Sequence, residues 1–341
     1  MLIPLGYSEP TSPLTPQAKL SQKQITILSG ALSLHGEIPE LGLTYQICLE
    51  RAKSLGLTHI ALVVQGHSAD IYASSIDLDG PHSTSLSTVR SVAKQAKQLG
   101  LGVIIFPIIW LNKRGDGEWR GALNPTHVDR WWSSYEAWIS RLAELATEVD
   151  ASLLSVGSEL SSMEASEGRW RSLIRRVRTQ FSGSLIYSSN WDHYDGVQFW
   201  DELDFIGLTA YYPLTEEEGP KTLEVMKNRW SMIRVALLDW LGGLSINRGI
   251  FFTELGYPSQ VGGSTRPWHY LQSTQVDLDL QKTAFQAFRI TWGDEQRLHG
   301  INLWNMWGLG GPQDAWYTLW GKPAAQEARA LIQVLSNRSR R

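Results

Sequence analysis

The sequence predicts an α/β fold of the (β/α)8 TIM-barrel class in a single domain. Eight short apolar runs, each typical of a buried strand, alternate with segments of helical periodicity. The 341 residues are 43% hydrophobic and 19% charged, and no linker or change of composition divides them, which suits one large core. An open doubly wound sheet is the alternative, but that fold carries an early glycine-rich phosphate loop, and the sequence has none.

Turn residues and periodicity divide the chain into elements. Residues 1–22 are rich in Pro, Ser and Thr and are predicted to form an extended arm, so the barrel comprises residues 23–341. A long helix is predicted at 124–149, with Pro125 in its first turn. The other helices indicated by periodicity are 44–52, 87–99, 169–181 and 324–335. The predicted strands are 24–29, 58–64, 102–108, 152–160, 184–190, 205–211, 249–257 and 300–304.

Composition and charge argue against several classes of function. The net charge of −3 and pI near 6.3 do not suit a nucleic-acid-binding surface, and no apolar run reaches membrane-spanning length. Cys48 is the single cysteine, so no intrachain disulfide or multi-cysteine metal site can form. The eight histidines show no paired ligand spacing, so a metal hydrolase is not favoured.

The N-terminus and the tryptophan content leave two questions open. Residues 1–6 lack the basic region and long apolar core of a secretory signal, so the compartment is either cytoplasmic or extracellular with a signal removed. The oligomeric state is also open. The 16 tryptophans, against 11 tyrosines and 8 phenylalanines, fit a core filled with indoles, or a cleft whose flat apolar faces suit sugar rings.

Two predicted strands end on a single acidic residue. Glu159 ends the fourth apolar run, and Glu254 ends the seventh, followed by Gly256, which allows a sharp turn. The carboxyl ends of barrel strands are where active sites are built. A pair of carboxyl groups on one rim, one protonated and one ionised, is the arrangement that cleaves glycosidic bonds. A loop salt bridge is the simpler interpretation of either acid alone.

Several segments, in this order along the chain, resemble glycoside hydrolase family 113, the β-mannanases, within the superfamily of retaining barrel glycosidases. The resemblance covers roughly residues 40–335. It rests on Val156–Ser161, Trp170–Ile174, Tyr187–Trp191, Phe199–Gly207, Ala210–Leu214, Phe252–Tyr257 and Trp304–Trp307.

The resemblance implies a retaining hydrolase of β-1,4-linked mannan or a related β-linked polysaccharide or oligosaccharide. It implies that Glu159 is the general acid/base and that Glu254 is the nucleophile, which forms a covalent glycosyl-enzyme that water then releases. It also implies that the Tyr211 hydroxyl hydrogen-bonds the nucleophile and favours its ionised form. No metal or organic cofactor is implied.

Other residues near the predicted strand ends are candidates for substrate binding, and each has a structural alternative. Asn190 could bind a sugar hydroxyl or cap its loop, and Trp304 could form the floor of the sugar site. Arg120 is part of a family-like pair or a surface arginine. Whether Trp307 lines the cleft or the core is open. The remaining candidates are Trp119, Trp191 and Tyr212.

The sequence departs from the family pattern at the ends of the second and third strands. Residues 107–112 lack the His and Asp expected there, residues 64–68 lack the expected Trp, and Ser158 replaces an Asn common in the wider superfamily. The catalytic class is therefore better determined than the substrate. Another β-linked glycan, such as a glucan or an amino-sugar polymer, and a non-catalytic glycan-binding barrel remain alternatives, and endo versus exo action is open.

Overall fold

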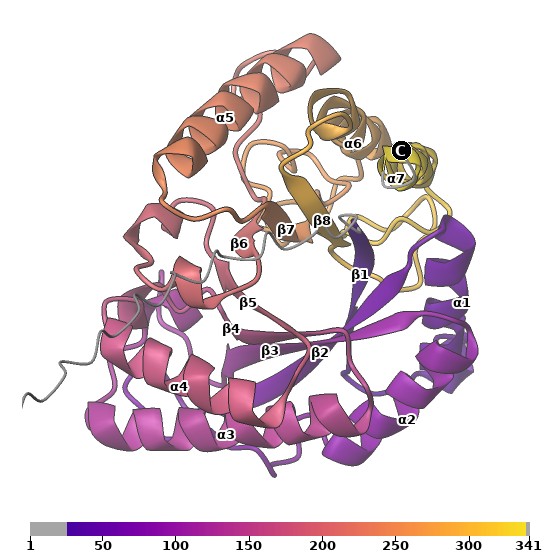
Figure 1. Ribbon diagram of the computed structural model, residues 1–341. Coiled ribbons are helices and arrows are strands. Elements are labelled where there is room, and N and C mark those ends of the chain that lie inside the picture. Colours follow the sequence, from indigo (N-terminus) through magenta and orange to yellow (C-terminus); the bar gives the residue numbers. More distant parts are fainter. Residues whose placement is uncertain (1–25, 339–341) are drawn as a thin grey trace, which may run out of the picture.

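Eight parallel strands close into a barrel in sequential order, with helices packed around the outside (Figure 1). The structure, a computed structural model, describes residues 26–338, so the arm predicted for residues 1–22 lies outside the described part. The predicted (β/α)8 fold is confirmed. Every predicted strand overlaps one that is present: β1 Ile27–Ser33, β2 His59–Ser68, β3 Gly102–Leu111, β4 Leu153–Ser158, β5 Ser184–Ser189, β6 Ile206–Thr209, β7 Ile250–Leu255 and β8 Leu298–Leu303.

The α-helices in the described residues are α1 Tyr45–Leu55, α2 Leu86–Gln98, α3 Val128–Glu148, α4 Glu167–Gln180, α5 Leu223–Gly243, α6 Leu278–Trp292 and α7 Ala324–Arg338. The five predicted helices overlap α1, α2, α3, α4 and α7, whereas no range was predicted for α5 or α6, and two further differences concern α3 and the β5–β6 connection. Helix α3 begins at Val128, so the prediction that Pro125 lies in its first turn was wrong. The N–H groups of Asn124 and Thr126 donate to the carbonyl groups of Ile71 and Tyr72, which holds this segment as a loop.

The second difference lies between β5 and β6, where the described chain has no α-helix between α4 and α5 (Figure 1). Two short 3-10 turns, η4 (Tyr194–Gly196) and η5 (Trp200–Glu202), occupy this segment. Arg171 of α4 donates two hydrogen bonds to the Asp201 carboxylate, at 2.8 and 2.9 Å, and one to the Gln198 carbonyl oxygen at 2.7 Å. A polar clamp and the buried Trp200 side chain therefore take the place of a packed helix.

The core has two parts, one inside the barrel and one between the barrel and the helices. Side chains at alternate strand positions, such as Val63, Phe106 and Phe251, fill the interior. The outer layer is larger and holds many of the indoles. Trp131, Trp132, Trp170, Trp230 and Trp292 are fully buried there. Much of the tryptophan content is therefore explained by packing rather than by a sugar-binding surface.

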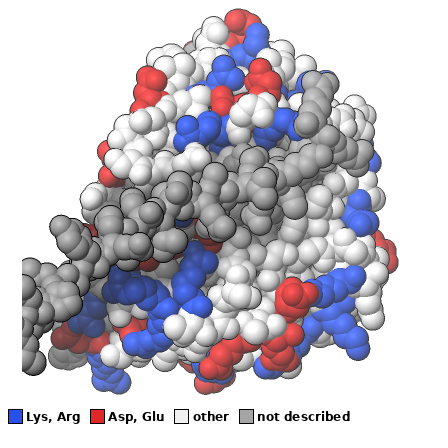
Figure 2. All heavy atoms as spheres, viewed as in Figure 1, with Lys and Arg blue, Asp and Glu red and all other residues white. Residues whose placement is uncertain are grey.

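Charged side chains are mixed on the surface. Basic and acidic groups are interspersed over the face seen in Figure 2. The arginine-rich helix α4 is neutralised locally, because its arginines pair with acids of neighbouring segments, as Arg176 does with Glu136 and Arg178 with Asp204. Within the described residues, no helix combines the length and hydropathy needed to cross a membrane.

Candidate active site

Glu159 and Glu254 lie at the same mouth of the barrel. Glu159 directly follows β4 and Glu254 is the penultimate residue of β7, and the carboxyl ends of all eight parallel strands meet at one end. Both side chains are buried, with exposures of only 5% and 2%. Closure of the barrel thus brings two acids that are far apart in sequence to one site.

A single guanidinium links the two acids. Nη2 of Arg120 is hydrogen-bonded to Oε2 of Glu159 and lies 3.7 Å from Oε1 of Glu254. The two carboxylate oxygens are therefore no more than about 7 Å apart, given an upper limit of about 3.2 Å for such a hydrogen bond. Retaining glycosidases place their carboxyl groups about 5–5.5 Å apart, and inverting ones about 6.5–9.5 Å. The limit of about 7 Å includes the separation of a retaining pair and excludes most of the range of separations found in inverting enzymes.

Glu254 is held by two hydroxyl groups besides the guanidinium. The Tyr211 hydroxyl donates to Oε2 at 2.9 Å, as the family resemblance implied, and the Ser158 hydroxyl makes a longer contact of 3.5 Å with Oε1. Burial and the neighbouring Glu159 raise the pKa of Glu254 to about 8, against the opposing effects of Arg120, Tyr211 and Ser158. Burial and the neighbouring acid thus both disfavour ionisation of Glu254 in the free protein.

Glu159 has a backbone conformation that is unusual for a residue with a side chain. Its φ of 52° lies in the left-handed region, which costs energy in residues other than glycine. Its N–H donates to the Ser188 carbonyl at 2.7 Å, and the next N–H, of Leu160, donates to the Tyr187 hydroxyl at 3.0 Å. That hydroxyl in turn donates to the buried Glu164 carboxylate at 2.8 Å. These bonds from β5 fix the direction in which Glu159 points.

The loop after β3 carries Trp119 and Arg120. Arg120 begins the 3-10 turn η2 (Arg120–Ala122), and the Trp119 indole packs over Gly121, where a Cβ would collide with the ring. The glycine is required by this close approach. Trp119 therefore supports the loop that delivers Arg120 to the carboxylates.

Asn190, Trp191 and Tyr212 form a separate group beside the pair. The Asn190 amide donates to Asp192 at 2.6 Å, in agreement with the loop-cap alternative. Tyr212 is buried, with its ring 5.3 Å from that of Trp191. Trp191 also stacks on the exposed Trp268, with ring centroids 5.8 Å apart. The Trp191–Trp268 pair is a flat aromatic surface on this side of the site, whereas Tyr212 belongs to the core.

Trp304 lies above the barrel interior, where it packs against the inner cluster. Its carbonyl oxygen lies so close to Gly256 that a Cβ there would collide with it, which explains the glycine after Glu254. Its neighbour Trp307 is half-buried against Tyr45 and His35, with ring centroids 5.6 and 6.4 Å away.

Sequence reasoning missed several residues that surround the pair. Tyr317, from the segment after β8, is buried with its ring 6.1 Å from that of Tyr211. Glu164 and Trp268 were missed as well. All three come from irregular segments without periodicity, so only the folded chain reveals them. Among the described residues, no group of three or more His, Cys, Asp or Glu side chains could hold a metal ion.

The comparisons with known proteins agree with this geometry. The model of glycoside hydrolase family 113 matches residues 45–315. The chain belongs to this family. The resemblance inferred from the motifs is thereby confirmed, as is the prediction that the protein is a glycoside hydrolase. No curated protein matched the chain significantly.

Solved structures of family 113 share the fold over nearly the whole length of the chain. The GH113 β-mannanase AaManA from Alicyclobacillus acidocaldarius, in complex with ManMIm, is 26% identical, with a TM-score of 0.75 over 91% of this chain and 97% of that chain. Another GH113 β-1,4-mannanase is 22% identical, with a TM-score of 0.78 over 92% and 99%. A family 5 mannosidase from Rhizomucor miehei, 9% identical at a TM-score of 0.65 over 93% and 94%, resembles the chain in fold alone.

Proposed function

We propose that this family 113 protein hydrolyses β-1,4-linked mannan, or a related β-linked glycan, with retention of anomeric configuration. The observation that carries the proposal is the contact of one guanidinium, that of Arg120, with two buried carboxyl groups at the barrel mouth. Family membership and the β-mannanases among the structural neighbours support the substrate class.

In this mechanism Glu254 attacks the anomeric carbon while Glu159 gives its proton to the leaving oxygen. A covalent glycosyl ester forms on Glu254 as the glycosidic bond breaks. Glu159, now ionised, then takes a proton from water, which attacks the same carbon and releases Glu254. The Tyr211 hydroxyl, 2.9 Å from Oε2 of Glu254, stabilises the ionised carboxylate before attack and after release.

The protonation of the free protein must change for this reaction to begin. Glu254 must be ionised to attack, yet burial and Glu159 raise its pKa to about 8 in the free protein. Arg120 is placed to redistribute the proton, because it contacts Glu159 and lies 3.7 Å from Glu254. Movement of the guanidinium toward Glu254 when a sugar binds would lower the pKa of Glu254 and favour the ionised nucleophile.

The decisive experiment separates the roles of the two glutamates. Parent, Glu159→Ala and Glu254→Ala proteins are assayed on mannan, glucomannan, glucan, xylan and amino-sugar polymers, and on an aryl glycoside of the preferred sugar. Glu254→Ala should lose activity on every substrate, because it lacks the nucleophile. Glu159→Ala should still react with the aryl glycoside, whose leaving group needs no acid, and azide should accelerate release as a β-glycosyl azide.

Three outcomes would count against the proposal. Turnover of Glu254→Ala equal to that of the parent would exclude Glu254 as nucleophile. An α-glycosyl azide would exclude retention. Glu224→Gln, on the exposed side of α5 and paired with Lys227, serves as the matched control and should retain parental rates. If the parent binds glycans but releases no product, the non-catalytic alternative is correct.

A further inference from the structure

A further buried carboxyl group, that of Glu164, lies behind the turn that carries Glu159. Glu164 directly follows the 3-10 turn η3 (Ser161–Met163), so the chain passes from Glu159 through one short turn to Glu164. The residue is only 4% exposed. The mechanism proposed above gives this acid no part in bond cleavage, so its place beside the general acid/base needs another explanation.

Two hydroxyl groups of β5 bind the Glu164 carboxylate. The Tyr187 hydroxyl donates to Oε1 at 2.8 Å, and the Ser189 hydroxyl donates to the same oxygen at 3.2 Å. Between these two residues lies Ser188, whose carbonyl oxygen accepts the Glu159 N–H at 2.7 Å. Strand β5 therefore holds both ends of the segment, Glu159 through the backbone and Glu164 through its side chain.

The Tyr187 hydroxyl connects Glu164 to the backbone beside Glu159. A phenol has one proton, and here that proton goes to Glu164, which leaves the oxygen free to accept. The Leu160 N–H occupies this acceptor at 3.0 Å. Leu160 directly follows Glu159, whose φ of 52° is strained and persists only where surrounding contacts hold it. Glu164 thus sets the orientation of the hydroxyl that supports the strained turn.

An acid is a costly side chain for this position. Burial raises the pKa of Glu164 to about 7, as does the nearby Glu159, while the bonds from Tyr187 and Ser189 and the neighbouring His193 act in the opposite direction. A buried carboxyl group costs free energy that an apolar side chain of similar volume would not. Stability alone therefore gives no reason for a glutamate here, whereas support of the turn at the acid/base does.

We propose that Glu164 is a positioning residue for the general acid/base: through the Tyr187 hydroxyl it holds the turn at Glu159, and with it the direction of the Glu159 carboxyl group. The inference rests on the proposed function for the role of Glu159. Nucleophilic attack should be largely independent of Glu164, because Glu254 lies on β7 and takes its 2.9 Å bond from Tyr211.

Three variants and one matched control test this role. Glu164→Leu removes the acceptor, Glu164→Gln keeps a carbonyl oxygen in its place, and Tyr187→Phe removes the oxygen that joins Glu164 to the turn. Tyr135→Phe is the control, because it also removes a buried phenol oxygen, but one whose 2.6 Å bond goes to the Val156 carbonyl oxygen rather than to the turn.

Each protein is assayed for kcat/KM on an oligosaccharide of the preferred sugar and on its dinitrophenyl glycoside. The oligosaccharide has a poor leaving group that needs a proton, whereas the dinitrophenolate leaves without one. In Glu164→Leu and Tyr187→Phe, kcat/KM should fall about 10- to 100-fold on the oligosaccharide and no more than about threefold on the dinitrophenyl glycoside. Glu164→Gln and Tyr135→Phe should keep the parental ratio of the two values.

Two kinetic results would overturn the inference. Equal losses on both substrates in Glu164→Leu and Tyr187→Phe would show a general structural role. A Glu164→Gln protein with a ratio as low as that of Glu164→Leu would exclude the acceptor oxygen as the basis of the effect. If Glu164→Leu does not fold, Tyr187→Phe decides, because it removes a single oxygen atom.

The positioning role and the proposed hydrolysis fail in different ways. A parent that cleaves neither substrate would contradict the hydrolysis, and crystal structures of the parent and of Tyr187→Phe would then test the positioning. A Glu159 carboxyl group displaced from the Arg120 guanidinium in the variant would support the inference. An unchanged turn at Glu159 in the variant would overturn it.

Discussion

At the scale of single residues, the chemistry depends on a small group of buried side chains that carry or contact charge. Two carboxyl groups, one guanidinium and one phenol lie in contact at a mouth from which most solvent is excluded. Charge in such a place interacts more strongly than in water, so one hydrogen bond changes both protonation and rate. We therefore expect Arg120 and Tyr211 to influence both protonation and reaction rate, although little of either side chain is exposed.

Replacement of Tyr211 by Phe tests the phenol directly. Loss of its 2.9 Å hydrogen bond removes a group that favours ionised Glu254, so the pKa of Glu254 should rise further. We expect kcat/KM to fall about 10- to 100-fold, as for other hydrogen bonds to charged groups, with its acidic limb shifted to higher pH. Tyr212→Phe is the control, because that phenol is in the core. Identical pH–rate profiles for parent and Tyr211→Phe would contradict this role.

Glu254 should also make stability depend on pH. Its folded-state pKa of about 8 exceeds the ordinary value of 4.5, so the folded protein binds the extra proton between these values. The contribution of this group is complete below pH 4.5 and is lost as the pH rises toward 8. Glu254→Gln cannot ionise, so its melting temperature should exceed that of the parent by at least ~2 °C at pH 8, with little difference at pH 5. A difference in melting temperature between Glu254→Gln and the parent that shrinks as the pH rises would contradict the raised pKa of Glu254.

At the scale of elements, irregular segments position the site while strands supply its main residues. The loop after β3 brings Arg120 to both acids, and β5 fixes the strained turn at Glu159 through the Tyr187 hydroxyl. The helix-free connection from β5 to β6 depends on Arg171. Such segments lack the backbone ladders of helices and strands, so side-chain bonds must hold them.

Arg171→Met should weaken the β5–β6 connection. The arginine also bonds to Glu167 at 2.7 Å and to Glu202 at 3.3 Å, so one substitution removes contacts to four residues. We expect a loss of about 1–2 kcal/mol in the free energy of urea unfolding, and a smaller loss at high salt. Arg175→Met, on the same helix with one 3.3 Å contact to Glu202, should cost under about 0.5 kcal/mol. Equal losses in the two variants would rule out a clamp.

At the scale of the whole molecule, barrel closure turns separate strand ends into one site. The strands could be predicted because buried parallel strands are continuous apolar runs, and Glu159 and Glu254 stand out as acids that end such runs. Arg120 was a candidate from its motif, but no local pattern indicates that it contacts both acids. Tyr317, Trp268 and Glu164 depend on the paths of irregular segments, which tertiary contacts decide.

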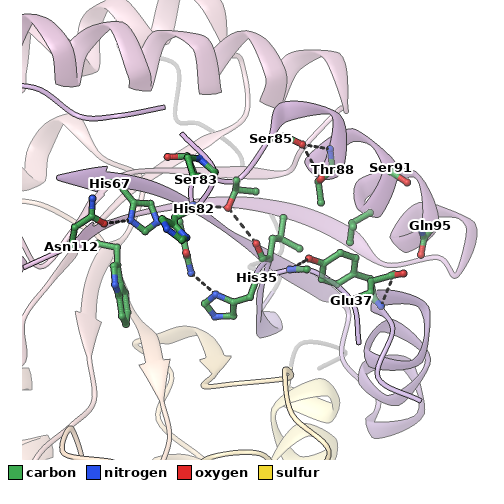
Figure 3. Close-up of a pocket in the computed structure, with 18 residues that line it drawn as sticks. His35, Glu37, His67, His82, Ser83, Ser85, Thr88, Ser91, Gln95 and Asn112 are labelled. Atoms are coloured by element: carbon green, nitrogen blue, oxygen red, sulfur yellow. Dashed lines mark hydrogen bonds between the residues drawn. The ribbon is translucent and has the colours of Figure 1, made fainter. Parts of the chain in front are cut away.

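The ends of β2 and β3 show the same division between local and tertiary information. The departures from the family pattern at residues 64–68 and 107–112 were visible in the sequence. That His67 lines a pocket and hydrogen-bonds Asn112 (Figure 3) follows from strand register and from contacts that need the folded chain.

Covalent trapping tests the assignment of the nucleophile most directly. A 2-deoxy-2-fluoro glycosyl fluoride of the preferred sugar slows both steps through its fluorine at C2, while its good leaving group lets the first step proceed, so the glycosyl-enzyme accumulates. Peptide mapping by mass spectrometry should find one sugar ester on Glu254, and none on the Glu254→Gln variant. A sugar ester on Glu159, on Glu164 or on any other residue would contradict the account.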